Sequence, residues 1–279
     1  MTVINTNTAA TLTANALAKN ERAMATSMER LSTGLRINSA GDDAAGLAIS
    51  SRMTSQINGL NQAVRNANDA TSMVQTADGA LIEVTNMLQR MREIAVQGAS
   101  GTNTGTNDMA AINTEYEALR DEVFQIVDDT QWNGATLLDG NVVAAGDQTV
   151  DFHVGANASQ KVTIDFGDFE TGSFGTFTAA HNIDAAGEAN TAIGIIDTAL
   201  TTVNSKRAVF GAAINRLEHT ADNLANVSQN TSASRSRILD ADYASETTEL
   251  ARTQIIQQAG TAMLSQANQQ AQSVLALLK

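Results

Sequence analysis

The chain has 279 residues, with no proline, no cysteine, one Trp, two Tyr and seven Phe, and its formal net charge is −13. The lack of cysteine excludes disulfides and thiolate metal sites, and an aromatic content of 4% is poor for a wide globular core. Proline disrupts helix interiors, so its absence from a chain of this length is typical of long helices.

The excess negative charge lies in the middle of the chain. Residues 1–100 hold eight basic and eight acidic side chains, residues 101–200 hold two and sixteen, and residues 201–279 hold seven and six. No basic patch suited to nucleic acid is present. Residues 1–18 and 253–278 carry no charge, but Thr, Asn and Gln interrupt both, so neither predicts a membrane span or a signal peptide. Uncharged ends indicate burial against other protein chains, and an acidic middle indicates exposure to solvent.

Apolar residues seven apart predict a first helix over about residues 12–36. Its two rows consist of Leu17, Met24 and Leu31, and of Met28 and Leu35. A turn follows at residues 38–43, where Asp42 or Asp43 is expected to cap the next helix.

The second predicted helix, over about residues 44–98, has the longest regular pattern in the chain. Its apolar row is Met53, Leu60, Ala67, Val74, Leu81, Leu88 and Ala95. A pattern this long indicates a coiled coil or helical array, because one helix cannot bury such a stripe alone. A loop rich in Gly, Thr and Asn at 98–107 leads to a third predicted helix over about 108–129.

The pattern changes after residue 130. An Asn133-Gly134 turn signal precedes two stretches, at 150–154 and 162–166, in which apolar and polar residues alternate. These stretches predict short strands. Residues 130–180 are therefore expected to form a small β subdomain that carries most of the acidic surface.

Two further helices are predicted over about residues 188–235 and 241–278. The first has the row Ile196, Val203, Phe210, Leu217 and Leu224. The second has apolar positions at Leu250, Ile256, Met263, Leu264, Leu277 and Leu278. The predicted fold is therefore mainly α, a long antiparallel coiled-coil or helical rod with both termini at one end and a small β-hairpin subdomain in the middle.

No set of residues predicts catalysis. The three histidines are scattered without metal-ligand spacing. The aspartates at 42–43 and 240–242 precede predicted helices, where carboxylates act as caps. Asp165, Asp168 and Glu170 could gather a hard cation, but the loop lacks an EF-hand pattern. We therefore expect no enzymatic activity, no cofactor and no metal site.

Several long motifs stand at opposite ends of the chain. Residues 31–49 read LSTGLRINSAGDDAAGLAI, and residues 254–269 read QIIQQAGTAMLSQANQ. Shorter motifs are residues 216–220 (RLEHT), 236–242 (SRILDAD) and 132–140, with WNG followed by LLDG. These motifs resemble those of bacterial flagellins, and the likeness covers roughly residues 1–140 and 190–279, in order.

The resemblance implies a structural subunit that self-assembles into the bacterial flagellar filament used for swimming motility. Residues 1–42 and 240–279 would form a terminal coiled coil in the filament core, 43–129 and 185–239 a helical rod, and 130–184 an acidic, outward-facing β subdomain. The residues expected in the polymerisation core are Leu17, Met24, Met28, Leu31, Leu35, Leu250, Ile256, Met263, Leu264, Leu277 and Leu278. The heptad residues expected inside the rod are Met53, Leu60, Val74, Leu81, Leu88, Ile196, Val203, Phe210, Leu217 and Leu224.

The resemblance also implies partners and a location. The partners are the flagellar cap and hook-junction proteins, an export chaperone at the C-terminal helix, and the vertebrate flagellin-sensing Toll-like receptor, with no nucleic acid and no membrane. Export through a flagellar type III apparatus would place the subunit outside the cell without a cleaved signal peptide.

One segment resembles the part of flagellin that the Toll-like receptor recognises. It comprises Gln89, Arg90, Ile94 and Gln97, with Glu115 on the adjoining helix. Arg90 and Ile94 would lie at the centre of the contact. Alternatively, these residues pack neighbouring subunits, and both roles are compatible.

A second hypothesis is a hook–filament junction protein or another exported, flagellin-like interaction protein. Such a protein would share the terminal helices. It would not grow into long homopolymers.

Overall fold

The computed structural model describes residues 7–102, 106–142, 147–170, 174, 177 and 182–276, with side chains up to residue 269 in the last helix. The chain forms two compact units. The terminal unit comprises Met1–Ser55 and Gln229–Lys279, and the middle unit comprises Gln56–Ser228. The fold is mainly α with two small antiparallel hairpins, which confirms the predicted class.

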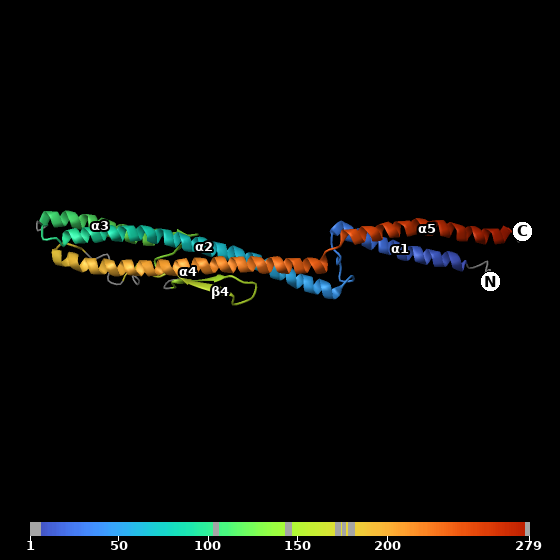
Figure 1. The fold of residues 1–279 in the computed structure, drawn as a ribbon, viewed down its shortest axis with the longest axis horizontal. Coiled ribbons are helices and arrows are strands. Elements are labelled where there is room, and N and C mark those ends of the chain that lie inside the picture. The colour runs from blue at the N-terminus through green and yellow to red at the C-terminus, as the bar shows by residue number, and fades with distance from the viewer. Residues whose placement is uncertain are drawn as a thin grey trace. The chain divides into compact units, whose positions relative to one another are not determined.

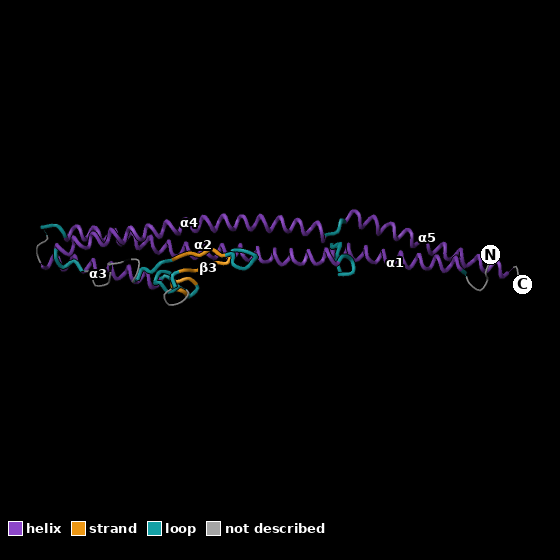
Figure 2. Tube along the Cα trace, turned by 90° about the horizontal axis from the view of Figure 1, so that it is seen from below, coloured by secondary structure: helices purple, strands orange, loops and turns teal. Residues whose placement is uncertain are grey.

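The terminal unit is built on an antiparallel pair of helices, α1 (Thr8–Thr33) and α5 (Tyr243–Ala276) (Figures 1 and 2). Asn7 caps α1 by accepting a hydrogen bond from the backbone N–H of Ala10 (3.1 Å), and its side-chain amide donates to the carbonyl of Ala267 (3.1 Å). The described ends of the two helices therefore lie together, as predicted. Helix α1 ends three residues before the predicted residue 36, because Gly34 takes a left-handed conformation (φ 73°).

Two short connectors join this pair to the long helices of the chain. Their backbones form an isolated bridge between Leu35 and Asp240, in which Arg36 N–H donates to Leu239 (2.7 Å) and Ala241 N–H donates to Gly34 (2.9 Å). This bridge ties two segments that are about 200 residues apart in sequence.

Carboxylates cap the helices that follow the connectors, as the sequence predicts. Asp43 accepts from the N–H of Gly46 (2.8 Å) at the start of α2, and Asp242 accepts from the N–H of Ala244 (3.0 Å) at the start of α5. Asp42 accepts from the backbone and hydroxyl of Ser39, and these hydrogen bonds hold the pKa of its carboxyl below the usual value.

The middle unit packs three helices around a main apolar core, and a smaller cluster of Leu60, Ala63 and Leu224 lies apart from it. Helices α2 (Ala44–Gly98) and α4 (Ala186–Leu239) run antiparallel, since Arg92 pairs with Asp197 (2.7 Å) near one end and Ser228 bonds to Asn61 (2.8 Å) near the other. Helix α3 (Thr106–Asp129) adds Tyr116, Val123 and Val127 to the same core. The observed bounds of α2 equal the predicted ones.

The two predicted strands pair as one hairpin, each one residue earlier than predicted, and a shorter hairpin that the sequence signalled only by its turn lies at residues 131–136. Strands β1 (Gln131–Trp132) and β2 (Ala135–Thr136) are joined by Asn133 and Gly134, whose φ angles of 50° and 84° are those of a type I′ turn. Strands β3 (Thr149–His153) and β4 (Lys161–Asp165) pair from Thr149↔Asp165 to His153↔Lys161. Along β4 the side chains alternate between exposed and buried, and Val162 and Ile164 point into the core of the helices.

The phenylalanines gather in one part of this core. Phe124 lies against Phe177 (ring centroids 5.7 Å apart) and Phe174 (6.3 Å), and Phe166 lies against Phe210 of α4 (5.5 Å). The β segment therefore widens the helical core at this place, and aromatic rings fill the added width. Only this short part of the chain has such a wide core, which agrees with the low aromatic content of the whole chain.

Tyr116 is a buried polar group at the centre of the middle unit. Among the described residues its hydroxyl has no hydrogen-bond partner, and burial raises its pKa to about 12. We predict that Tyr116→Phe leaves stability at neutral pH unchanged or raises it by about 1 kcal/mol, because an unpaired buried hydroxyl is removed. Thermal unfolding measures this. The unfolded tyrosine ionises first as pH rises, so the wild type should lose stability between pH 10 and about 12, and the variant less.

The matched control is Tyr243→Phe. The hydroxyl of Tyr243 donates to the carbonyl of Leu31 (3.0 Å), so its loss should never increase stability. A Tyr116→Phe protein that is less stable than the wild type by more than about 1 kcal/mol would contradict the prediction, because it would reveal a partner for the hydroxyl.

Candidate functional site

The α1–α5 pair shows only part of its apolar side chains to solvent. Five of the predicted polymerisation residues are half-buried between the helices, and Leu35 is half-buried in the connector. The five are Leu17, Met24, Leu31, Leu250 and Leu264. Three others are exposed, namely Met28 (54%), Ile256 (42%) and Met263 (61%). Leu277 and Leu278 lie outside the described residues.

The buried side chains of this pair are polar. Within the described parts of α1 and α5, the buried residues are Asn20, Ser27 and Thr253, and no apolar side chain of either helix is fully buried. Of the expected second row of α1, Met28 faces outward in the single chain, and the neighbouring Ser27 takes the buried position. Ser27 and Thr253 are small, and Leu17 packs directly on Gly260 of the facing helix.

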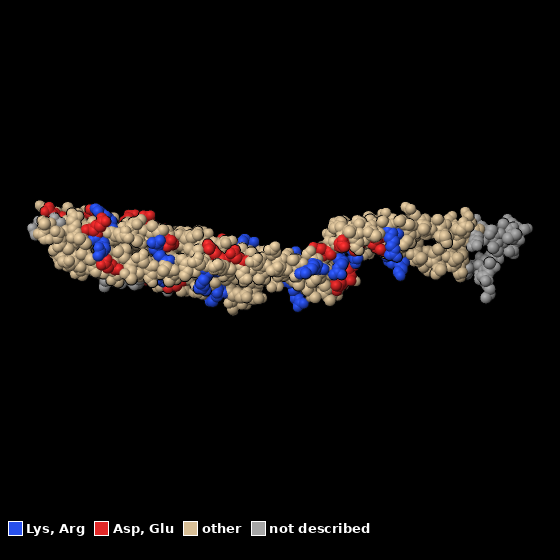
Figure 3. Space-filling model, viewed as in Figure 1, with Lys and Arg blue, Asp and Glu red and all other residues tan. Residues whose placement is uncertain are grey.

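Further exposed apolar residues adjoin those that the sequence predicts. Leu12 on α1 and Ile255 on α5 are 73% and 66% exposed. The described terminal parts of the pair form a surface without charged side chains, next to the grey atoms in Figure 3. An exposed apolar surface without charges is suited to association with other protein chains.

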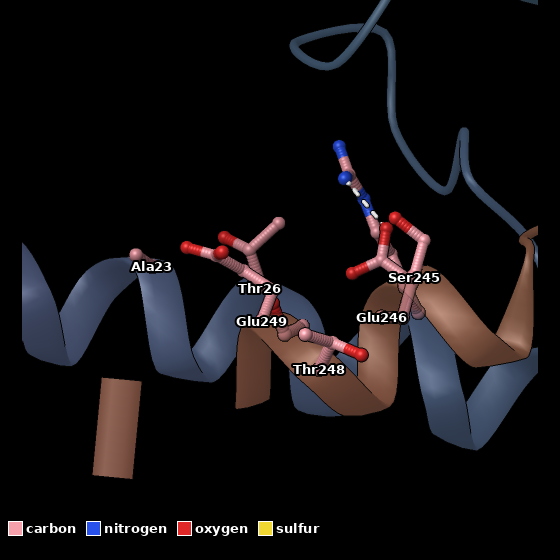
Figure 4. Close-up of a pocket in the computed structure, with 8 residues that line it drawn as sticks. Ala23, Thr26, Ser245, Glu246, Thr248 and Glu249 are labelled. Carbon is pink, nitrogen blue, oxygen red and sulfur yellow. Dashed lines mark hydrogen bonds and ion pairs between the residues drawn. The ribbon is translucent and has the colours of Figure 1, made fainter. Parts of the chain in front are cut away.

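A polar groove of about 590 Å³ opens between α1 and α5 (Figure 4). Its lining residues are Ala23, Thr26, Ser27, Arg30, Ser245, Glu246, Thr248 and Glu249. Arg30 donates to Glu246 across the groove (3.0 Å), while the Nε atom of Arg30 is buried without a partner among the described residues. The hydroxyls of Thr26 and Thr248 donate to carbonyls of their own helices, Arg22 (3.0 Å) and Ala244 (2.8 Å). The ion pair between Arg30 and Glu246 thus connects the two helices that line this groove.

The residues expected inside the rod lie in the core of the long helices. Nine of the ten are buried, and Met53 is half-buried. The buried nine are Leu60, Val74, Leu81, Leu88, Ile196, Val203, Phe210, Leu217 and Leu224.

The receptor-like segment divides between surface and core. Arg90 is exposed and binds two carboxylates, Glu115 of α3 (2.7 Å) and Glu93 (3.0 Å). Gln89 and Gln97 are also exposed. Ile94 is only 2% exposed and packs in the core, so in the single chain its side chain is not part of that surface.

The acidic residues of the β region take structural positions. Asp165 pairs with Lys206 of α4 (2.6 Å) and accepts from the N–H of Gly167 (2.9 Å). Burial, together with the nearby Asp139, raises the pKa of Asp128, which lies near the end of α3.

Over the residues that the structure describes, no three His, Asp or Glu side chains are grouped as metal ligands. His181 lies outside these residues. None of the described helices is long and apolar enough to cross a membrane.

Sequence reasoning missed Asn20 and Gly260. Asn20 lies three residues after Leu17 and four before Met24, so it occupies a position of the apolar stripe itself. A polar residue in such a stripe is a recognisable signal. Gly260 lies inside α5, where glycine is unfavourable, and a Cβ atom there would come within 3.2 Å of Cδ1 of Leu17.

Comparisons with known proteins match both ends of the chain. The family models of the bacterial flagellin N-terminal and C-terminal helical regions match residues 4–143 and 193–278. A flagellin of Halalkalibacterium halodurans is 50% identical over 90% of each chain, and a flagellin of Bacillus subtilis is 42% identical over 99% of each chain. The crystal structure of Bacillus cereus flagellin (35% identity) aligns with a TM-score of 0.51 over 57% of this chain and 88% of that one.

The Arg30–Glu246 ion pair gives a prediction for the terminal pair. Glu246→Gln keeps the shape of the side chain but removes the charge that Arg30 faces, so we expect the pairing of α1 with α5 to weaken by about 1 kcal/mol. Hydrogen exchange of the amides in residues 20–30 measures the effect. The control is Glu29→Gln, which neutralises an exposed carboxylate of α1 and should leave exchange nearly unchanged. Equal exchange rates in both variants would refute the prediction.

Proposed function

The chain belongs to the bacterial flagellin family and is a structural subunit of the flagellar filament, and we propose that its subunits join through the exposed apolar side chains of α1 and α5. In this proposal residues 1–42 and 240–279 form the filament core. Residues 43–129 and 185–239 form the surrounding helical layer, and residues 130–184 face solvent.

One observation carries this proposal. The terminal pair lacks a buried apolar residue among its described side chains, yet large apolar residues remain exposed along it, among them Leu12, Ile255 and Met263. Burying apolar area contributes about 25 cal/mol per Å². Association with neighbouring pairs would therefore supply the stabilisation that the pair lacks alone.

Charge supports the assignment of the exterior. The two basic and sixteen acidic side chains of residues 101–200 contrast with the uncharged residues 1–18 and 253–278. Like charges repel when brought together, so the acidic part is best placed toward water and the uncharged ends between subunits.

A filament subunit of this kind is expected to have no enzymatic activity, and flagellins are a structural protein family. The alternative of a hook–filament junction protein is not favoured, because the matching family models and the similar curated proteins named above are flagellins. The filament that flagellins form lies outside the cell.

The remaining partners are part of the proposal. We expect the flagellar cap and hook-junction proteins to contact the subunit in the filament. Before assembly, an export chaperone would cover the exposed apolar residues of α5, and export would use the flagellar type III route. The exposed side chains around Arg90 and Glu115 would contact the vertebrate flagellin-sensing receptor.

Polymerisation tests the proposed joining surface. We predict that Ile255→Ser combined with Met263→Ser blocks growth from filament seeds. Both changes remove exposed apolar area from α5, which the proposal buries between subunits. Deletion of residues 253–279 should do the same and leave the middle unit folded. Sedimentation and electron microscopy after seeding measure growth.

The matched control is Val209→Ser combined with Val96→Ser, since these two valines are also exposed but lie in the middle unit. This control should reduce growth much less. Normal filaments from the Ile255/Met263 variant or from the deletion would overturn the proposal.

Receptor recognition gives a separate prediction. Arg90→Ala removes an exposed cation that Glu93 and Glu115 hold in place. The protein concentration that half-maximally activates a receptor reporter cell should therefore rise at least about tenfold, which corresponds to a loss of about 1.4 kcal/mol of binding free energy. Arg92→Ala, which breaks a similar exposed pair with Asp197, is the control and should change activation less. Equal activation by wild type and Arg90→Ala would reject a role for this segment.

A further inference from the structure

The terminal helices carry two exposed thioethers, on Met28 of α1 and Met263 of α5. We propose that these two side chains form a redox-sensitive site, where oxidation by a peroxide blocks the joining of subunits and reduction of the resulting sulfoxides restores it. The effect on joining rests on the proposed function, whereas the selective oxidation of these two methionines is a property of the free chain.

Exposed methionines are confined to these two helices in the part of the chain that the structure describes. The chain has nine methionines, and all except Met1 are described. Met28 and Met263 are 54% and 61% exposed. The other six are half-buried or buried, and they are Met24, Met53, Met73, Met87, Met91 and Met109. An oxidant in solution therefore reaches the sulfur atoms of Met28 and Met263 first.

This accessibility does not depend on the pairing of α1 with α5. Met28 and Met263 face outward from the paired helices, and separated helices would leave them at least as exposed. In contrast, Met73 and Met91 lie in the core of the middle unit, where they are 7% and 0% exposed. Their oxidation requires that core to open. The difference in reactivity between the two groups therefore holds for any arrangement of the terminal helices.

The chain offers the oxidant no more reactive sulfur. It has no cysteine, whose thiolate would react in place of a thioether. Leu12, Ile255 and Ile256 are also exposed on the terminal helices, but their side chains are hydrocarbons that a peroxide leaves unchanged. Among the exposed aliphatic side chains in the described parts of α1 and α5, oxidation therefore alters the methionines alone.

The reaction is the transfer of one oxygen atom. A lone pair of the methionine sulfur attacks one oxygen of hydrogen peroxide, so that an S–O bond forms, the O–O bond breaks and the second oxygen leaves as water. The sulfur is oxidised by two electrons and the peroxide is reduced by two. A methionine sulfoxide reductase reverses the change, since a pair of thiols becomes a disulfide while the sulfoxide oxygen leaves as water. Because this chain has no thiol, the reductant comes from outside it.

Oxidation turns an apolar contact into a polar one. A thioether contributes apolar area and adapts to its neighbours, whereas a sulfoxide carries an oxygen that needs a hydrogen-bond donor. Residues 253–278 hold no Lys or Arg, so the helix around Met263 supplies no charged donor. Burying the sulfoxide oxygen without a donor is unfavourable. An oxidised subunit is therefore expected to join poorly, whereas a subunit within a filament is shielded because joining covers both side chains.

Mass spectrometry of peptides tests the selectivity after brief treatment with dilute hydrogen peroxide. In the free chain, Met28 and Met263 should become sulfoxides at least about tenfold faster than Met73 and Met91, because the latter react only when the core opens. In seeded filaments, the oxidation of Met28 and Met263 should slow at least about tenfold, because neighbouring chains cover them.

Seeded growth tests the consequence. Growth of peroxide-treated wild type should fall at least about tenfold and recover after treatment with methionine sulfoxide reductase and a thiol reductant. Met28→Leu combined with Met263→Leu keeps the apolar volume but has no sulfur at either position, so this variant should grow equally before and after peroxide. The matched control is Met53→Leu combined with Met87→Leu, which replaces two half-buried methionines of α2 and should stay as sensitive as wild type.

Equal oxidation rates for Met28, Met263, Met73 and Met91 would overturn the proposal, and so would undiminished growth of the oxidised wild type. Continued sensitivity of the Met28/Met263 variant would also overturn it, because another residue would then cause the loss. If that variant does not grow even untreated, the reductase decides, and a lack of recovery in wild type rejects the proposal. If untreated wild type does not grow from seeds, the proposed function fails together with the effect on joining, while the mass spectra of the free chain still decide the selectivity.

Discussion

A pair of helices can cover only a narrow strip of its own surface, and this constraint governs the terminal unit. Within the described parts of α1 and α5 only Asn20, Ser27 and Thr253 are fully buried, and Leu17, Met24 and Leu264 are half-buried. The apolar residues on the outer sides, such as Met263, have no cover within the described chain. An apolar stripe that two helices cannot bury is stabilised by further helices, and a second copy of the chain is the partner that the proposed function supplies.

The middle unit meets the same constraint in another way. A third helix and two hairpins cover the stripe between α2 and α4, so side chains such as Val74, Leu88 and Phe210 are fully buried within one chain. The width added by β3 and β4 is filled by aromatic rings, and nothing comparable is found in the described part of the terminal pair. The acidic side chains then lie on the surface of the middle unit, whose apolar core is buried within one chain. The net charge of −13 belongs to this part of the chain.

How far the sequence predicts this fold depends on how regular each pattern is. The row from Met53 to Ala95 predicts both ends of α2, because seven-residue spacing continues without proline and a capping aspartate precedes it. In α1 the apolar pattern does not show which positions the partner helix covers. Ser27 is buried and Met28 is exposed, and a small residue at a close helix contact leaves no apolar signal. Ile94 appears in a surface motif but packs in the core, because the motif alone does not show which helix face is covered. The bridge from Leu35 to Asp240 uses backbone atoms, so no pattern of side chains predicts it.

The polar character of the α1–α5 contact follows from its role in the proposed assembly. If large apolar residues were fully buried in the contact, the pair would gain stability within one chain and would depend less on neighbouring chains. If the contact were only weak, the two helices could slide, and the apolar residues of the outer face would not stay aligned. The hydrogen bond from Asn20 to Thr253 and the backbone bridge between Leu35 and Asp240 align the two helices while adding little apolar burial. The stabilising apolar area is thereby left on the outside, where only a neighbouring chain can bury it.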